Sequence, residues 1–208
     1  MLYDSELNQS RVISLIAPQK YGKTTIVHYL AEEYSKRVKT FVFDTNFERV
    51  STYGDIHKNI YFLYQVDLTK SKEEFLNESI QYIRSKHYNI CIIIEDYDKY
   101  CEGGKKSSQN NNMFNLASDS RHQYIALIYT TKTPSYIPTT LRLNTNLTFI
   151  GKFPEGDETK SIYSMIPRSA KKEYSTLARP EFLAFDRENQ TTTKVRYNIN
   201  INDIEVVG

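Results

Sequence analysis

The sequence predicts an α/β protein built on a mainly parallel sheet. Short apolar runs alternate with helix-like stretches over most of the chain, which is the pattern of parallel strands connected by helices. The most strand-like run, "NICIIIED" (89–96), is continuously apolar rather than alternating, as expected for a strand covered on both faces. Near the C-terminus "EFLAFD" and "KVRYNIN" are joined by "RENQTTT", which indicates a β-hairpin.

The first half of the chain supplies strands and two helices in alternation. Strands are expected at 11–17, 40–46 and 59–66, the first of them short and buried. The first helix is expected to follow the first strand and to run to about residue 37. The second is expected at 71–87, because its apolar residues recur at helical spacing, with Ser71 as the N-cap and Glu74 completing a capping box.

The second half continues the alternation after a polar, glycine-bearing stretch at 100–112, which is expected to be a loop. "MFNLASDSRH" (113–122) reads as a short helix, and strands are expected at 124–131 and 147–153. A weak helix near 156–166 is followed by a basic, irregular stretch and then by the hairpin.

Length and composition favour one ordinary globular unit. The 208 residues suit a single domain, and 39% hydrophobic with 25% charged residues is typical of a soluble protein. A net charge of +2 means that any nucleic-acid contact must come from local clusters. Two cysteines provide neither a disulfide framework nor a zinc site. The N-terminus lacks the pattern of a signal peptide, and no apolar run approaches the length of a membrane span, so we expect an intracellular protein.

The stretch "APQKYGKTT" (17–25) predicts a phosphate-binding loop. It lies between the first strand and the first helix, where backbone N–H groups and a helix N-terminus can hold phosphates. Lys23 is expected to reach the outer phosphates and Thr24 to bind Mg²⁺, whereas Ala17 replaces the usual first glycine. The nucleotide-contacting residues are therefore expected to be Ala17, Pro18, Gln19, Lys20, Tyr21, Gly22, Lys23, Thr24 and Thr25.

Two carboxylates follow the most apolar strand and are expected to complete the nucleotide site. ATPases with such a loop need a metal-binding acid and a water-activating acid at the end of a buried strand, usually Asp and then Glu. Here the order is Glu95–Asp96. Either Glu95 takes the metal position and Asp96 the water, or Asp96 serves the metal and Asp98 assists. GTP specificity is not expected, because "TTKT" (130–133) lacks the guanine-reading Asp after Lys132.

These motifs, with "SDSRHQYIALIYTTKTPSYIP" and "LRLNTNLTFIGKF" after them, resemble the FtsK/HerA superfamily of DNA-pumping ATPases. The similarity is greatest to its viral genome-packaging branch, and it covers roughly residues 11–153. The resemblance implies a RecA-like P-loop NTPase as a single domain over 1–208, with its core at 11–153 and an extension at 154–208.

The resemblance also implies the activity and the partners. These are ATP hydrolysis with Mg²⁺, a homo-oligomeric ring, sequence-independent movement of double-stranded DNA into a viral procapsid, and docking on a capsid vertex or membrane component. The expected location is the infected host cytoplasm or the virion. A non-viral DNA translocase of the same superfamily, or an assembly switch with weak hydrolysis, are the alternatives.

Individual roles follow from the same resemblance. Lys132 lies where the family has a polar sensor of the γ-phosphate. Arg121 is the first candidate, and Arg142 the second, for an arginine acting across a subunit boundary. Asp44 is expected either to orient the catalytic water or to cap a loop. The candidate DNA contacts are Lys105 and Lys106, whose loop is equally explained as a solvated surface loop. The tail residues Arg168, Lys171, Lys172 and Arg179 are further candidates, with a docking surface as the alternative.

Overall fold

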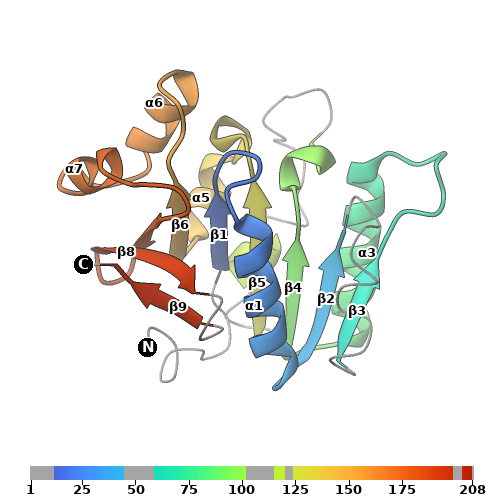
Figure 1. Ribbon diagram of the computed structural model, residues 1–208. Coiled ribbons are helices and arrows are strands. Elements are labelled where there is room, and N and C mark those ends of the chain that lie inside the picture. The colour runs from blue at the N-terminus through green and yellow to red at the C-terminus, as the bar shows by residue number, and fades with distance from the viewer. Residues whose placement is uncertain (1–11, 45–58, 102–114, 120–123, 199–202, 208) are drawn as a thin grey trace.

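A computed structural model gives the fold of the protein and describes residues 12–44, 59–101, 115–119, 124–198 and 203–207. One nine-stranded sheet runs through it in the order β3-β2-β4-β5-β1-β6-β7-β8-β9 (Figure 1). The strands are β1 (Val12–Ile16), β2 (Lys39–Phe43), β3 (Ile60–Leu63), β4 (Ile90–Ile94), β5 (Ile125–Thr131), β6 (Leu147–Gly151), β7 (Phe182–Asp186), β8 (Thr191–Asn198) and β9 (Asp203–Val206). The first six are parallel, and the last three are antiparallel.

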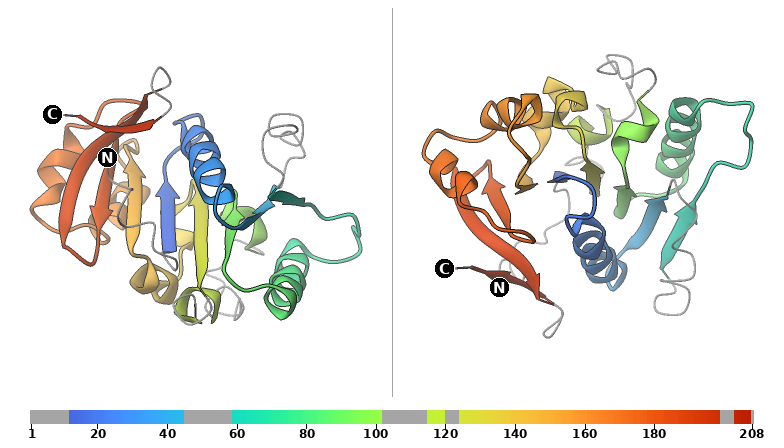
Figure 2. Two further views of the ribbon diagram at one scale, coloured as in Figure 1. Left: turned by 90° about the horizontal axis from the view of Figure 1, so that it is seen from below. Right: turned by 45° about the horizontal axis from the view of Figure 1, so that its top comes forward.

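Helices cover both faces of the parallel part (Figure 2). They are α1 (Lys23–Ser35), α3 (Lys72–Lys86), α5 (Thr139–Asn144), α6 (Asp157–Tyr163) and α7 (Ala170–Ser175), with short 3-10 helices η1 (Tyr97–Tyr100) and η3 (Pro134–Tyr136). The predicted α/β class, the mainly parallel sheet and the C-terminal hairpin β7–β8 are all confirmed.

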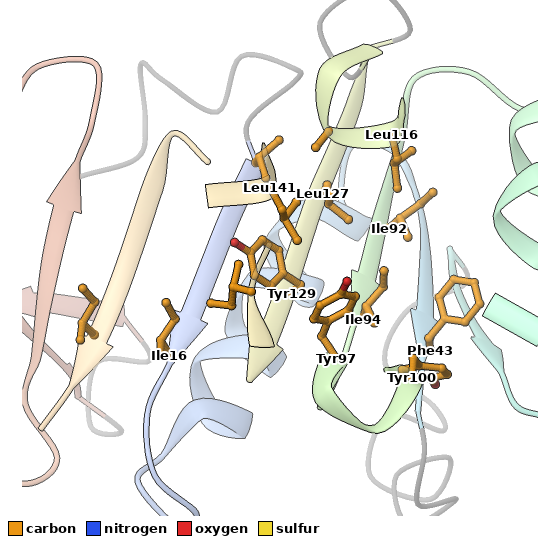
Figure 3. Packing of buried hydrophobic residues seen from close by; sticks show 14 of the residues in the cluster. Ile16, Phe43, Ile92, Ile94, Tyr97, Tyr100, Leu116, Leu127, Tyr129 and Leu141 are labelled. Atoms are coloured by element: carbon orange, nitrogen blue, oxygen red, sulfur yellow. The ribbon is translucent and has the colours of Figure 1, made fainter. Parts of the chain in front are cut away.

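Alternation along each strand divides the core between the two faces of the sheet. In β4, Ile92 and Ile94 pack with α3 and α5 on one face, whereas Cys91 and Ile93 pack with α1 on the other. Figure 3 shows the first of these clusters, where the rings of Tyr97 and Tyr129 meet edge to face with centroids 6.0 Å apart. A continuously apolar strand sequence is therefore explained by burial on both sides, as the sequence predicted.

The capping box of α3 is present as predicted. The Ser71 hydroxyl accepts from the Glu74 backbone N–H at 3.1 Å, and the Glu74 carboxylate accepts from the Ser71 backbone N–H at 2.9 Å. Both contacts satisfy donors that the helix itself leaves open.

Three assignments in the second half needed correction. The basic stretch before the hairpin was expected to be irregular, but it contains α7, which buries Ala170 and Tyr174 against the core. α5 and β9 were not predicted; β9 is a four-residue strand that pairs with β8, and its Asp203 carboxylate accepts from the Tyr29 hydroxyl at 2.8 Å. The loop expected at 100–112 lies outside the described residues except for Tyr100, which ends η1, and Cys101. The helix expected at 113–122 is described only at 115–119, which is helical.

Candidate nucleotide-binding site

The predicted phosphate loop lies at the carboxyl edge of the sheet, between β1 and α1 (Figure 1). Parallel pairing of β5 with both β1 and β4 brings the ends of these three strands together. Asp96 follows β4 and Lys132 follows β5, so both lie beside the loop. Ligands of open parallel sheets bind at this edge.

The loop has the backbone geometry of an anion cradle. Lys20 and Gly22 both adopt the left-handed conformation, with φ of 59° and 98°, a turn geometry that lets successive N–H groups converge. α1 begins directly after Gly22 with no side-chain cap and no acidic residue in its first turn. The positive end of the helix dipole is thus directed at the loop, where phosphate would bind.

Ala17 is tolerated at the first glycine position because of a glycine on the neighbouring strand. Ala17 is fully buried, and its N–H donates to the Thr131 carbonyl at 3.2 Å. A Cβ on Gly151 of β6 would lie 2.7 Å from the Ala17 Cβ and 2.6 Å from the Tyr21 ring. Gly151 therefore provides the space that Ala17 and Tyr21 fill.

Lys23 lies across the loop, with its ammonium group donating to the carbonyl groups of Ala17 at 2.6 Å and Pro18 at 2.9 Å. Burial lowers the pKa of Lys23 to about 8, while the nearby Asp96 and Asp98 carboxylates oppose this effect and Lys132 adds to it. A lysine in this environment gains from an anionic ligand, because phosphate oxygens would replace hydration that burial has removed.

A pocket of about 380 Å³ opens in front of the loop, lined by residues 19–24, Asp96, Lys99 and Lys132. Four ammonium groups against one carboxylate leave a formal charge of +3 among the lining residues. The pocket thus has the charge and position to bind a polyphosphate.

The three carboxylates after β4 have different surroundings. Asp96 lines the pocket, forms an ion pair with Lys99 at 2.9 Å and donates its backbone N–H to the Thr130 hydroxyl at 2.8 Å. Asp98 accepts from the Thr131 hydroxyl at 3.1 Å and pairs with the Lys132 ammonium at 3.7 Å. Glu95 is 4% exposed and is not among the lining residues. The pocket therefore presents Asp96 to a ligand, and Asp98 positions Lys132.

The comparison with known families decides the assignment. A family model described as an AAA domain matches residues 7–133, more than half of the chain, including the loop, Glu95–Asp96 and Lys132. This chain belongs to the AAA-domain family. It is an AAA-type P-loop ATPase, and nucleotide binding follows from that membership. No curated protein matches the sequence.

Solved structures share the fold of this AAA domain at low identity. The genome packaging NTPase B204 from Sulfolobus turreted icosahedral virus 2, in complex with ATP-gammaS, has a TM-score of 0.73 at 19% identity, over 90% of this chain and 98% of that one. EssC (ATPases 2 and 3) from Geobacillus thermodenitrificans has a TM-score of 0.64 at 15% identity, and the match covers 86% of this chain and 38% of that one. The pCW3 conjugation coupling protein TcpA has a TM-score of 0.61 at 15% identity, and the match covers 90% of this chain and 60% of that one. The resemblance expected from the sequence is confirmed at the level of the fold.

Several predicted residues do not line the pocket of the AAA domain. Thr25 is exposed on the first turn of α1, and Asp44 lines a separate pocket of about 130 Å³ with Tyr64, Lys72 and Tyr100 among others. Arg142 lies on α5, where its guanidinium donates to the Thr139 hydroxyl at 3.2 Å. Arg121, Lys105 and Lys106 lie outside the described residues.

Sequence reasoning missed Lys99, Gly151 and the C-terminal residues that contact the loop. A signal existed for Gly151, because an isolated glycine inside the strand-like run "LTFIGKF" indicates a close backbone approach. Lys99 stands three residues after Asp96, the spacing of a helical ion pair, within a segment that was not expected to be helical. No local signal could have placed Arg179 beside Lys20, which is 159 residues away.

No helix among the described residues is long and apolar enough to cross a membrane. In the same part of the chain, no three His, Cys, Asp or Glu side chains gather as metal ligands. Mg²⁺ in nucleotide sites is commonly held by one or two protein groups together with the phosphates. The Thr24 hydroxyl and the Asp96 carboxylate, both in the pocket, fit that arrangement.

Proposed function

We propose that this AAA domain is an ATP-hydrolysing motor that moves double-stranded DNA into a viral procapsid. The observation that supports the motor most directly is the likeness of nearly the whole chain, C-terminal extension included, to nearly the whole of a genome packaging NTPase. The two other structures match this chain over less than two thirds of their own length. The proposal includes a ring of subunits, a capsid or membrane component at the docking point, and a single domain over 1–208.

In the proposed reaction, Lys23 exchanges the loop carbonyl groups for phosphate oxygens and neutralises charge as the γ-phosphate departs. Thr24 and Asp96 would hold Mg²⁺, which supplies further charge neutralisation at the phosphates. Lys132, fixed by Asp98, contacts the γ-phosphate from the end of β5. We assign water activation to Glu95, the acid that directly precedes Asp96; because its carboxylate is buried and does not line the pocket here, this role requires it to turn toward the bound nucleotide.

DNA contact is proposed for the exposed basic residues near α7 rather than for a base-reading element. Arg168, Lys172 and Arg179 are exposed and belong to the C-terminal extension. The helix α7 of this extension lies at the same end of the molecule as the phosphate loop (Figure 1). Contacts to phosphates alone give affinity without sequence preference, which translocation requires. Lys105 and Lys106 remain candidates from the sequence.

The first test measures phosphate release from Mg-ATP with and without double-stranded DNA. We expect turnover that rises with DNA and is lost in Lys23→Ala, while Lys39→Ala, which removes an exposed lysine at the start of β2, leaves it unchanged. ATP turnover that does not change when DNA is added would contradict the motor function but would agree with ATPase activity. ATP binding without turnover, with DNA present or absent, would favour an assembly switch.

A second test separates the two carboxylate assignments. If Glu95 activates water, Glu95→Gln binds Mg-ATP normally and loses about 10²–10⁴-fold in turnover. If Asp96 holds the metal, Asp96→Asn weakens the binding of Mg-ATP. The same variant should lose less affinity for ATP when binding is measured without Mg²⁺. The reverse pattern would assign the metal to Glu95 and the water to Asp96. Loss of turnover in Asp98→Asn, with Glu95→Gln unaffected, would assign the metal to Asp96 and the assisting role to Asp98.

A further inference from the structure

The side chain of Tyr21 extends from the phosphate loop into the C-terminal extension. Its hydroxyl donates to the Glu181 carbonyl at 3.0 Å and lies 3.5 Å from the Ala178 carbonyl. The ring packs edge-on against Phe182 with centroids 5.1 Å apart, and Tyr21 is 5% exposed. A residue of the nucleotide loop is thus fixed by residues about 160 positions later.

A second contact from the same segment reaches the neighbouring loop residue. The Arg179 guanidinium donates to the Lys20 carbonyl. Lys20 holds a left-handed backbone with φ of 59°, which is unfavourable for a residue with a Cβ. Such a conformation persists only where the surroundings hold it in place. Arg179 and Tyr21 supply that restraint, on the strained residue and on the one after it.

The contacting segment is itself ordered by internal hydrogen bonds. The Glu181 carboxylate accepts from the Ala178 N–H at 2.8 Å, and the Glu181 N–H donates to the Ala178 carbonyl at 2.6 Å. Phe182, 1% exposed, begins β7 directly afterwards. The carbonyl groups that Tyr21 uses are therefore held in place by the sheet.

We infer that residues 178–181 form a clamp that keeps the phosphate loop in its anion-receiving shape, with Tyr21 and Arg179 as positioning residues. The inference rests on the proposed nucleotide site and adds the element that maintains it. The left-handed residues Lys20 and Gly22 direct the loop N–H groups, and only Gly22 adopts that conformation without cost. At Lys20, where the left-handed backbone is unfavourable, the contacts of the clamp compensate for that cost.

The test uses the full chain and measures binding of pyrophosphate and of ATP by calorimetry, without DNA. Tyr21→Phe keeps the ring and loses the hydroxyl bonds; Arg179→Ala removes the contact to Lys20. We expect each to weaken pyrophosphate binding roughly fivefold, the factor that corresponds to about one net hydrogen bond. The matched controls are Tyr29→Phe, whose hydroxyl donates to the Asp203 carboxylate at 2.8 Å and does not line the pocket, and Arg37→Ala, an exposed arginine after α1. Both should bind as the native chain does.

A double-mutant cycle separates positioning from general stability. In Lys20→Gly the left-handed backbone carries no penalty, so adding Arg179→Ala should weaken binding much less than it does in the native chain. Equal effects of Arg179→Ala in both backgrounds, or native affinity in Tyr21→Phe, would overturn the clamp while leaving the nucleotide site intact. A native chain that binds neither ligand would overturn the nucleotide site and the clamp together.

Discussion

The Lys23 ammonium group donates to the carbonyl groups of Ala17 and Pro18 in the phosphate loop. Its pKa of about 8 reflects burial that two neighbouring aspartates only partly offset. A phosphate ligand would add negative charge beside the ammonium group and would raise that pKa. Protonation of a single residue is therefore linked to nucleotide binding.

From this linkage we predict proton uptake when ATP binds at pH 8. About half of the Lys23 side chains are neutral at their own pKa, and ATP favours the charged form, so up to about half a proton should be taken up per nucleotide. At pH 6.5 the lysine is already charged and its contribution should vanish. Calorimetry in buffers of different ionisation enthalpy measures the number, and Lys23→Met should abolish the pH 8 excess. Equal uptake in Lys23→Met would assign the proton to another group.

Gly151 should tolerate no side chain while Ala17 and Tyr21 occupy their places. In Gly151→Ala the new Cβ would lie 2.6–2.7 Å from both residues, so we predict a loss of about 1–3 kcal/mol in the free energy of unfolding, together with weaker ATP binding. Adding Ala17→Gly removes one of the two clashes and should restore part of the loss. Thermal unfolding of the two variants measures both effects; an unchanged melting temperature in Gly151→Ala would contradict the packing argument.

Among the elements, α1 and α3 differ in how their N-termini are satisfied. α3 has a complete capping box and two acidic residues in its first turn, whereas α1 has neither a side-chain cap nor an acid there. An N-terminus whose N–H groups are already capped cannot receive a phosphate, so the open N-terminus of α1 agrees with its place beside the phosphate loop. Helix α3 covers the sheet, packing Leu76, Ile80 and Ile83 into the core.

Removing the cap of α3 should therefore affect stability and leave the nucleotide site unchanged. We predict that Ser71→Ala costs about 1 kcal/mol in the free energy of unfolding, because the Glu74 N–H loses its acceptor. Denaturant unfolding measures this cost, and ATP affinity should stay at the native value. Ser71→Asp, which can still cap the helix, serves as the control. A drop in ATP affinity without loss of stability would contradict the separation of the two helices.

At the scale of the whole molecule, the antiparallel strands extend the same sheet that carries the nucleotide site. β7 pairs with β6, and the segment before β7 contacts the phosphate loop. The loop is therefore buttressed from the β6–β7 side by the extension, while the pocket faces the ends of β4 and β5.

For the proposed ring, we predict complementation between two inactive variants. Lys23→Ala cannot use its own pocket, and Arg121→Ala cannot serve a neighbour's pocket if Arg121 acts across the boundary. In a mixed ring, an Arg121→Ala subunit has a native phosphate loop and a Lys23→Ala subunit has a native Arg121. Where the two are neighbours, a complete site forms, so ATP hydrolysis should reappear in the mixture. Activity of the mixed and separate variants measures this; the same experiment with Arg142→Ala tests the second candidate. A mixture as inactive as its components would contradict an arginine acting in trans.

The fold class and the position of the phosphate loop follow from local patterns in the sequence. The apolar runs of β1, β4 and β5 are long enough and pure enough to be buried strands in almost any arrangement, and the Gly22–Lys23–Thr24 triplet needs only the strand before it and the helix after it. These are local properties, since hydrophobic pattern and turn geometry act over a few residues.

The distant residues that reach the loop could not be found without the three-dimensional packing. Gly151, Arg179 and Glu181 contact Ala17, Lys20 and Tyr21 across the β1–β6–β7 part of the sheet. Asp44 and Asp96 follow neighbouring strands, yet they line different pockets. Strand order and side-chain direction set these contacts, and both depend on packing of the whole chain rather than on any local pattern.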